Sequence, residues 1–129
     1  MLVLTSLYEN LQNTLGLHTV NLIRILMHVI SKKTFEGAAN KYPKYAKAIM
    51  QAYDLLRKVE CNTPEELKSY FSSLDNFEYK DKWYVIDISG NNIQLMAFIE
   101  FRAGKMFVKH VVNHPDYDKL CERNVKGDL

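Results

Sequence analysis

The chain has 129 residues, of which 47% are hydrophobic, and its one Trp, eight Tyr and six Phe suffice for the core of a single domain. The formal net charge of +2 is too small to indicate a partner by itself. No stretch reaches the roughly 18 apolar residues that a membrane span needs, and the sequence contains no Gly-rich phosphate loop, HExxH zinc motif or GxSxG serine motif.

The charges are unevenly distributed along the chain. Residues 31–58 carry seven basic and two acidic residues, whereas residues 60–100 carry three basic and eight acidic residues. A basic N-terminal half is suited to a polyanion or an acidic protein, although a solvated lysine-rich helix face explains it equally well. The two cysteines, Cys61 and Cys121, lack metal-ligand spacing, so we expect reduced thiols in an intracellular protein.

Residues 1–26 carry leucines at helical spacing, followed by a short apolar run. They are either an amphipathic helix that packs on the domain or an extension upstream of a native start at Met27. Residues 27–30 fit a short strand.

Two helices are predicted next, joined at a corner with the sequence YPKY. Ser31 is a suitable N-cap for the first helix, whose apolar stripe leads to Pro43. The second helix carries an apolar stripe from Ile49 to Val59. Together they predict a helical hairpin.

A third, shorter helix has a well-marked start in the sequence TPEE. Thr63 is a suitable N-cap, Pro64 fits the first helical position, and Glu66 closes a capping box. The following segment, LDNFEYKDK, is rich in charge and is predicted to be an exposed loop that leads to the sheet.

Three strands are predicted at Trp83–Ile88, Asn92–Phe101 and Lys105–Val112, with the turns SGNN and RAGK between them. Gly and Asn in these turns supply the positive φ that tight hairpins need. Alternation in the middle strand assigns two faces. One face carries Ile93, Leu95, Ala97, Ile99 and Phe101, and the other carries Gln94, Met96, Phe98, Glu100 and Arg102. In the third strand, alternation places Lys109 with Phe107 and Val111 and places His110 on the opposite face.

Asn113 is a suitable N-cap for a last short helix that continues to Leu120, and residues 122–129 form a polar tail. The domain of residues 27–121 therefore has the order β, α, α, short α, β, β, β, α. We expect an α+β fold in which the helical hairpin covers one face of an antiparallel sheet. The opposite face is then free to carry a binding or catalytic site.

That second face presents Gln94, Lys109 and, near the entrance of the first long strand, Lys82. His114 and Tyr117 lie at its end, in the first turn of the last helix. The positive end of this helix favours both a neutral imidazole and a bound phosphate. The set is suited to RNA phosphodiester chemistry. In that chemistry a base takes the ribose 2′-OH proton, cations stabilise the phosphorane and an acid protonates the leaving 5′-oxygen, so no metal or other cofactor is required.

Each of these residues also has a structural interpretation. A His after a strand is more often an ordinary residue of a helix start than a catalyst, and a strand lysine such as Lys109 is usually solvated. Tyr117 is also able to stack on a base. The pattern alone therefore indicates a small α+β domain that binds RNA or a protein partner.

Four segments, in order, resemble the HigB toxins, members of the RelE/ParE superfamily of type II toxin–antitoxin systems. The segments are MHVISKKTFEGAANKYP, TPEELKSYFSSLDNF, WYVIDISGNN and VVNHPDYDKL. The last segment contains the family's Thr-His-x-x-Tyr-Asp signature, with Asn113 in place of Thr. The resemblance extends from Met27 to about Cys121, and the family's Met-His-x-Ile start matches the sequence at Met27.

The resemblance implies a RelE-like fold, an antiparallel sheet with two helices on one face and the RNA site on the other. It implies a cytoplasmic, metal-independent endoribonuclease that cuts mRNA in the 30S A site of the ribosome and leaves a 2′,3′-cyclic phosphate and a 5′-OH. It also implies a HigA-type helix-turn-helix antitoxin, which neutralises the toxin and through which alone operator DNA is bound. No membrane partner is expected.

The signature falls on His114, Tyr117 and Asp118. Lys109 stands where many members have Arg, and Lys82 matches a basic position before the first long strand. The expected catalytic residues are thus His114, Lys109, Tyr117 and Lys82, and the expected RNA-binding residues are Gln94, Arg102 and Asp118. At Gln94 many members have Arg, and Gln has no charge with which to hold a phosphate bidentately. Lys109, Lys82 and Arg102 are candidates to compensate for that loss.

Two other functions remain open. Glutamine at position 94 is compatible with a weakened or inactive toxin that acts through antitoxin and operator binding. A ParE-like poison of another target, such as gyrase, uses the same fold, although the His-x-x-Tyr-Asp cluster argues against it.

Overall fold

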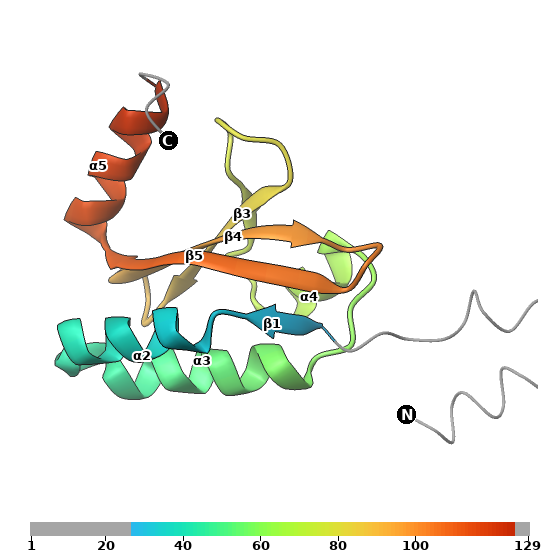
Figure 1. The fold of residues 1–129 in the computed structure, drawn as a ribbon, viewed down its shortest axis with the longest axis horizontal. Helices are drawn as coiled ribbons and strands as arrows, with labels where there is room; N and C mark the ends of the chain where they lie inside the picture. The colour runs from blue at the N-terminus through green and yellow to red at the C-terminus, as the bar shows by residue number, and fades with distance from the viewer. Residues whose placement is uncertain (1–26, 126–129) are drawn as a thin grey trace, which may run out of the picture.

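The computed structural model describes residues 27–125 (Figure 1). The elements, in chain order, are β1 (His28–Ile30), α2 (Lys32–Lys41), the 3-10 turn η2 (Pro43–Tyr45), α3 (Ala46–Lys58), α4 (Pro64–Tyr70), β2 (Asp75–Asn76), β3 (Trp83–Ile88), β4 (Ile93–Glu100), β5 (Lys105–Asn113) and α5 (His114–Val125). The predicted α+β class is confirmed. The expectations for residues 1–26 and for the last four residues of the tail lie outside the described residues.

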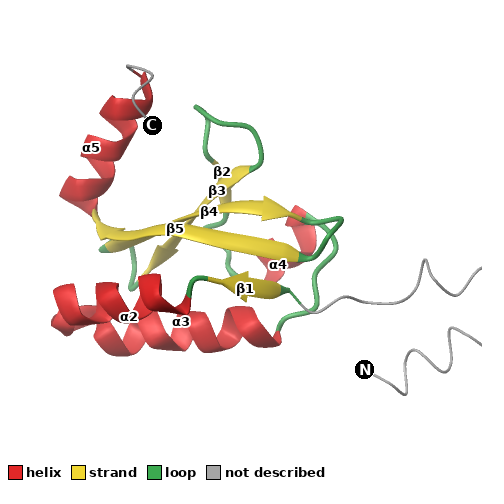
Figure 2. Ribbon diagram, in the orientation of Figure 1, coloured by secondary structure: helices red, strands yellow, loops and turns green. Residues whose placement is uncertain are grey.

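The sheet has the strand order β1-β5-β4-β3-β2 (Figure 2). The meander of β3, β4 and β5 is antiparallel, as predicted, and each of these strands agrees with its predicted range to within one residue at either end. Two features were not predicted. β1 pairs in parallel with β5, so the sheet is mixed at that edge, and β2 pairs with β3 within a segment that was predicted to be a loop.

The helical hairpin of α2 and α3 covers one face of the sheet (Figure 1). Its buried stripe supplies Phe35, Ile49 and Leu56, all with no exposed surface. The sheet supplies the face of β4 that alternation assigned to the core, and the four β4 side chains in this cluster are Ile93, Leu95, Ala97 and Ile99. The predicted alternation of β4 is therefore confirmed, and this two-layer core holds the hairpin on the sheet.

The predicted helix starts differ in how they are capped. Thr63 caps α4 as predicted: its Oγ1 accepts a hydrogen bond of 3.2 Å from the backbone N–H of Glu66, and Glu66 Oε1 in turn accepts one of 3.1 Å from the N–H of Asn62. Ser31 does stand at the N-cap of α2, but its φ is 98° and its side chain makes no capping hydrogen bond. The predicted N-cap position is therefore confirmed, but the hydrogen bond that a serine cap supplies is absent.

The turn between β3 and β4 has positive φ at Ser89 and Gly90, and the turn before β5 has positive φ at Gly104. The expectation that Asn supplies the positive φ is thus wrong, because Ser89 does so instead. At Gly90, the φ of 68° is one that a side chain would strain.

A β-bulge in β5 changes which of its residues face which side. Ala97 pairs with Val108 and Met96 pairs with His110, so Lys109 is an extra residue between them. Because directly opposed residues share a face, His110 lies on the side of Met96, whereas Val111, opposite Leu95, joins the core under the hairpin. The three β5 assignments beyond the bulge, those of His110, Val111 and Val112, were therefore predicted wrongly, since Val112 lies opposite Gln94 on the second face.

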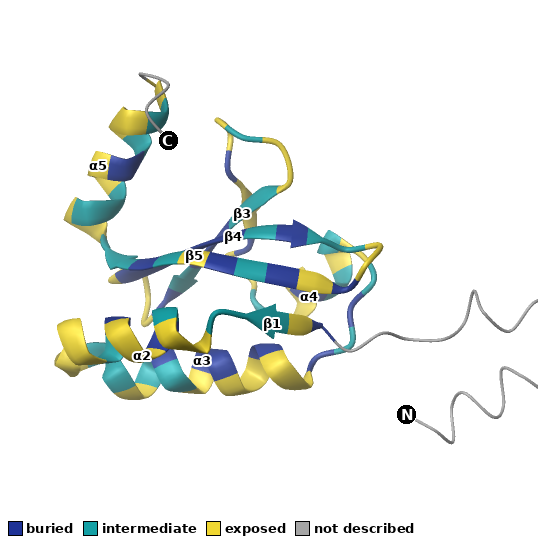
Figure 3. Ribbon diagram, in the orientation of Figure 1, coloured by how far each residue is buried: buried dark blue, intermediate teal, exposed yellow. Residues whose placement is uncertain are grey.

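The second face of the sheet has a small core of its own. Phe77, Val85, Met96 and Leu120 are buried together there, with part-buried Tyr117 of α5 packed against them. This cluster fastens α5 to the sheet, and the helix continues to Val125, beyond Cys121, where the predicted domain ends. The face that was predicted to be uncovered is thus partly covered, and Figure 3 shows the buried positions along the sheet with a more exposed α5 beside it.

Candidate functional site

A hollow of about 300 Å³ lies at the end of the sheet where β5 leads into α5. It contains His114, Tyr117 and Gln94, three of the residues singled out in the sequence. Two carboxylates, Asp75 and Asp87, also line it. The complete lining is Ser73, Asp75, Asn76, Val85, Asp87, Asn91, Gln94, His114 and Tyr117. The hollow is therefore rich in hydrogen-bond acceptors.

The first turn of α5 holds His114 at this hollow. Asn113 caps the helix as predicted, because its Oδ1 accepts a hydrogen bond of 3.0 Å from the N–H of Asp116. The Asp116 carboxylate accepts hydrogen bonds from the Tyr42 hydroxyl at 2.8 Å and from Lys41 Nζ at 3.4 Å. These contacts, led by the Tyr42 hydroxyl, lower the pKa of Asp116. The turn that carries His114 is thereby tied to the end of the helical hairpin.

The three signature residues lie together on α5. His114 Nε2 is 3.7 Å from Asp118 Oδ1, and both side chains are more than half exposed. The rings of His114 and Tyr117 have centroids 6.3 Å apart. Burial, followed by the neighbouring Cys121 thiol, raises the pKa of Tyr117, so its phenol stays protonated at neutral pH and is able to donate a hydrogen bond.

Gln94 faces this side of the sheet, as alternation predicts, but its side chain is only 3% exposed. Its Nε2 donates hydrogen bonds to the Asn91 carbonyl at 2.7 Å and to Asp87 Oδ1 at 3.3 Å. Its buried Oε1 has no hydrogen-bond partner among the described residues. Gln94 therefore forms the floor of the hollow and joins the β3–β4 turn to β3.

The structure separates the other predicted residues from this hollow. Lys82 binds Glu100 at 2.8 Å, an ion pair that raises the pKa of Lys82 and lowers that of Glu100. Arg102 lies in the turn after Glu100. Glu100 is six residues from Gln94 along β4, or about 20 Å. Lys82 and Arg102 thus lie at the opposite end of the sheet from His114.

Lys109 lies between these two ends, at the bulge. It is exposed, and its Nζ is 5.7 Å from the centroid of the Phe107 ring. Lys109 is therefore directed along the open part of the sheet and away from His114. Of the seven predicted residues, the hollow brings together His114, Tyr117 and Gln94, with Asp118 in contact with His114.

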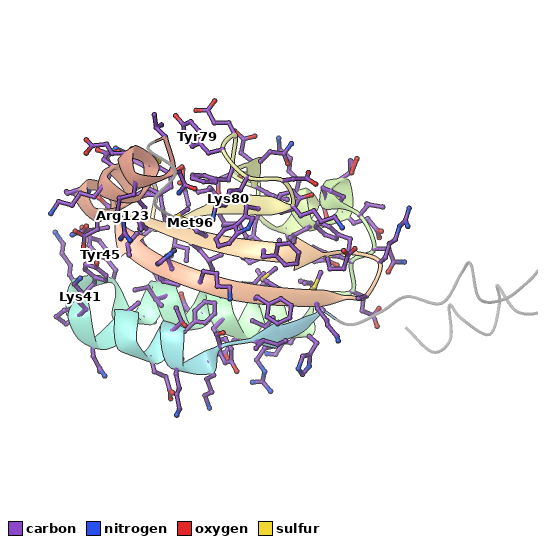
Figure 4. All side chains as sticks on the ribbon, turned by 45° about the horizontal axis from the view of Figure 1, so that its top comes forward. Lys41, Tyr45, Tyr79, Lys80, Met96 and Arg123 are labelled. Atoms are coloured by element: carbon purple, nitrogen blue, oxygen red, sulfur yellow. The ribbon has the colours of Figure 1, made fainter. Side chains whose placement is uncertain are left out.

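Sequence reasoning missed a basic group on the open part of this face. His110 is half-buried, and its pKa is lowered by burial first and then by Arg123, Lys109 and Lys80. These residues come from β5, α5 and the β2–β3 loop, and in Figure 4 Lys80 and Arg123 are labelled on either side of Met96. No local signal in the sequence marked this group, because Lys80, Lys109 and Arg123 are far apart in the chain, and only the bulge places His110 with them.

Two searches of the described residues were negative. Between residues 27 and 125, no cluster of three or more His, Cys, Asp or Glu side chains is arranged to hold a metal ion. Over the same range, no helix has the length and hydropathy of a membrane span.

Known proteins match this chain over most of its described part. A family model for the HigB toxin, described as the RelE-like toxic component of a toxin–antitoxin system, matches residues 45–120. A curated protein named mRNA interferase HigB, from Escherichia coli O6:H1, is 48% identical over 94 residues, which is 73% of this chain and 91% of that protein. The mRNA interferase toxin HigB of Escherichia coli K12 is 37% identical over 92 residues, 71% of this chain and 88% of that protein.

Proposed function

This chain belongs to the HigB family of RelE-like toxins, and from that membership we propose that it is an endoribonuclease that cleaves mRNA and so inhibits translation. Two curated relatives are named as mRNA interferases, which supports mRNA as the substrate. The observation that carries the proposal is the hollow in which His114 and Tyr117 meet, beside a basic open sheet face.

The proposed reaction runs on side chains, without a metal ion. His114 takes the proton of the ribose 2′-OH, and the 2′-oxygen attacks the adjacent phosphorus. The bond from phosphorus to the 5′-oxygen then breaks, and the leaving oxygen receives a proton. Tyr117 is suited to donate a hydrogen bond to that oxygen, because its raised pKa keeps the phenol protonated. The products are a 2′,3′-cyclic phosphate and a 5′-OH.

The charges of the site support a particular placement of the RNA. Asp75 and Asp87 disfavour a phosphate inside the hollow, but they accept hydrogen bonds from a base or a ribose. The phosphates are better placed over the open face, toward Lys109. Asp118 holds and orients His114, while Lys82 and Arg102 serve the RNA farther along the strand, at the other end of the sheet.

The partners follow from the same proposal. As a toxin of a toxin–antitoxin family, the chain has an antitoxin partner. We propose that this partner is a HigA-type helix-turn-helix protein that also binds the operator DNA, and that the mRNA is cut in the A site of the ribosome in the cytoplasm.

Induced expression of variants tests the site. The unaltered chain should arrest growth and produce new 5′ ends in cellular mRNA. His114→Ala, Tyr117→Phe and Lys109→Ala should each relieve the arrest, whereas His28→Ala, at an exposed histidine on β1, should remain toxic. Circular dichroism and thermal melting serve to check that each variant is folded. Full toxicity of all three site variants would contradict the proposed residues, and an absence of new 5′ ends would contradict the activity.

A weakened toxin is the second candidate, because Gln94 replaces a charged residue of the family pattern. Gln94→Arg separates the two. The structure places Asp87 within reach of a longer donor at this position, so the variant is expected to fold. A higher cleavage rate in this variant would favour a weakened enzyme. An unchanged rate would show that the enzyme does not need a charge at position 94.

A further inference from the structure

Three aromatic side chains form a row across the second face of the sheet. Trp83 of β3 is paired with Phe98 of β4, and Phe98 is paired with Phe107 of β5. Directly opposed residues share a face, and Phe98 lies two residues from Met96, so the row is on the side of His110. All three side chains are partly exposed. We call this row, Trp83, Phe98 and Phe107, the aromatic row.

The aromatic row differs from the aromatic residues of the two cores. Phe35 and Phe77 are buried, and their rings pack on other apolar side chains. In the aromatic row the ring centroids of Phe98 and Phe107 are 6.2 Å apart, with the rings at 51° to each other, and neither residue belongs to a buried cluster. Trp83 is partly exposed and packs against the edge of the smaller cluster. An apolar surface of this kind, left partly open across three strands, is one that a partner covers.

Cations surround the aromatic row. Lys80 Nζ lies 5.1 Å from the centroid of the Trp83 ring, and Lys109 Nζ lies 5.7 Å from that of Phe107. His110 follows Lys109 on the same face, and Arg123 reaches it from α5. Acidic residues also lie nearby: Glu100, which is paired with Lys82, and Glu78 and Asp81, which line the hollow of Lys80 and Trp83 at the edge of the row. The cations from β5 and α5 lie on the side of the row away from that hollow. The occupant of this surface therefore combines flat apolar groups with negative charge.

Single-stranded RNA has that chemistry. Proteins that bind it stack the bases on aromatic side chains of an open sheet face and contact the phosphates with lysine and arginine. We propose that the aromatic row is a stacking platform for unpaired bases of the RNA substrate, with Lys80, Lys109 and Arg123 contacting the flanking phosphates. This rests on the proposed function and adds the part of the site that binds the substrate strand beyond the cut.

The position of the platform defines which nucleotides it holds. Phe98 is four residues along β4 from Gln94, which places the row about 13 Å from the floor of the hollow. The small core around Met96 lies between the two. The platform therefore binds bases that flank the cleaved bond, and the base at the cut lies in the hollow.

The single tryptophan of the chain makes the proposal directly measurable. The purified protein is titrated with a short single-stranded 2′-O-methyl oligoribonucleotide, which cannot be cleaved because it lacks a free 2′-OH. Trp83 emission should be quenched in a saturable manner. Phe98→Leu and Phe107→Leu keep an apolar side chain and remove the flat stacking surface, and each should weaken binding about tenfold. Phe101→Leu is the matched control, because Phe101, in the turn just after β4, packs against Tyr84 and the larger core on the other side of the sheet.

A second measurement uses the protein on its proposed substrate. In a translating extract, Phe98→Leu and Phe107→Leu should slow the appearance of cleaved mRNA, while Phe101→Leu should not. The platform is overturned if Trp83 emission is unaffected by the oligonucleotide and the Leu variants also cleave at the original rate. Quenching by an added protein partner but not by RNA would overturn it as well, because the row would then be a protein-docking surface.

The two proposals fail in different ways. If RNA quenched Trp83 emission but no new 5′ ends appeared in mRNA, the platform would be supported and the endoribonuclease activity would be contradicted. If both Leu variants cleaved mRNA at the original rate and RNA did not quench Trp83 emission, the platform would be contradicted and the endoribonuclease activity would be supported.

Discussion

Among residues 27–125, Gln94 is the one polar residue that is buried with the core side chains. Its amide donates to two acceptors, the Asn91 carbonyl and the Asp87 carboxylate. A buried donor between two acceptors is hard to replace, because any substitute without an N–H leaves both of them unpaired. The residue that departs from the family pattern is thus also a structural link of the hollow.

Gln94→Glu tests this link with almost no change in shape. The new carboxylate would face Asp87 and the Asn91 carbonyl, so the free energy of unfolding at neutral pH should fall by about 3 kcal/mol. Gln51→Glu, at an exposed position of α3, should change it by less than about 0.5 kcal/mol. The loss should shrink as the pH is lowered, because the buried carboxyl takes up a proton. Urea denaturation at two pH values measures both effects, and equal losses in the two variants would contradict the role of Gln94.

The environment of His110 predicts how the stability of the fold depends on pH. The pKa of His110 is lowered in the folded state, chiefly by burial. The unfolded chain therefore takes up a proton first as the pH falls below about 6.5, and stability decreases with acidification. His110→Asn should lose less thermal stability than the parent chain between about pH 7 and pH 5, whereas His28→Asn, at the exposed end of β1, should follow the parent. If the melting temperature fell by the same amount with pH in all three proteins, His110 would be excluded as a source of the pH dependence.

At the scale of single elements, α5 depends on its first turn. Asn113 caps it, and this turn carries His114 and leads to Tyr117. Asn113→Ala should lower the free energy of unfolding by about 1 kcal/mol, and Asn113→Thr should cost less, because Thr is also a capping residue. Urea denaturation of both variants checks the order. A Thr variant that is as unstable as the Ala variant would show that the cap hydrogen bond is not what stabilises the turn.

Local signals explain which elements were predictable. The Thr63 capping box, the alternation of β4 and the Asn113 cap each depend on residues within a few positions of one another, and each was confirmed. β2 has only two residues, in a charged segment, and it forms because β3 is there to pair with it. Phe77 is buried for the same reason, since its core partners come from β3, β4 and α5. Such pairings are not visible in a local pattern.

The bulge limited the prediction of the site in a similar way. Alternation assigns each side chain of a strand to the correct face until a bulge inserts an extra residue. Nothing in the local sequence around Lys109 marks that bulge. Alternation also reports a face but no position along the strand. Lys82 and Arg102 were candidates to compensate for the missing charge at Gln94 because they are basic and were assigned to the same face, although about 20 Å of β4 separates them from it.

At the scale of the whole molecule, two cores of unequal size hold the layers together. The larger one fixes the helical hairpin to the sheet, and the smaller one, around Phe77 and Met96, fixes α5. Because the smaller core has few members, α5 should be the first element to separate from the sheet.

Leu120→Ala tests this order of stability. Leu120 is 7% exposed and belongs to the smaller core, so its truncation should cost about 2 kcal/mol. Hydrogen exchange should accelerate in α5 while α3 remains protected. Leu55→Ala, at a position that is 39% exposed, is the control and should leave both helices unchanged. Equal acceleration of α3 and α5 in the Leu120 variant would show that the two cores unfold as one unit.

The extra residue at Lys109 also limits which insertions and deletions β5 tolerates. Substitutions along β5 alter one side chain at a time, but an insertion or deletion before His110 would exchange the two faces for every position up to the start of α5. It would turn Val111 outward and His110 into the core. We therefore expect related chains to keep the length of β5 from the bulge to α5, while length changes accumulate in the turns on either side of the strand.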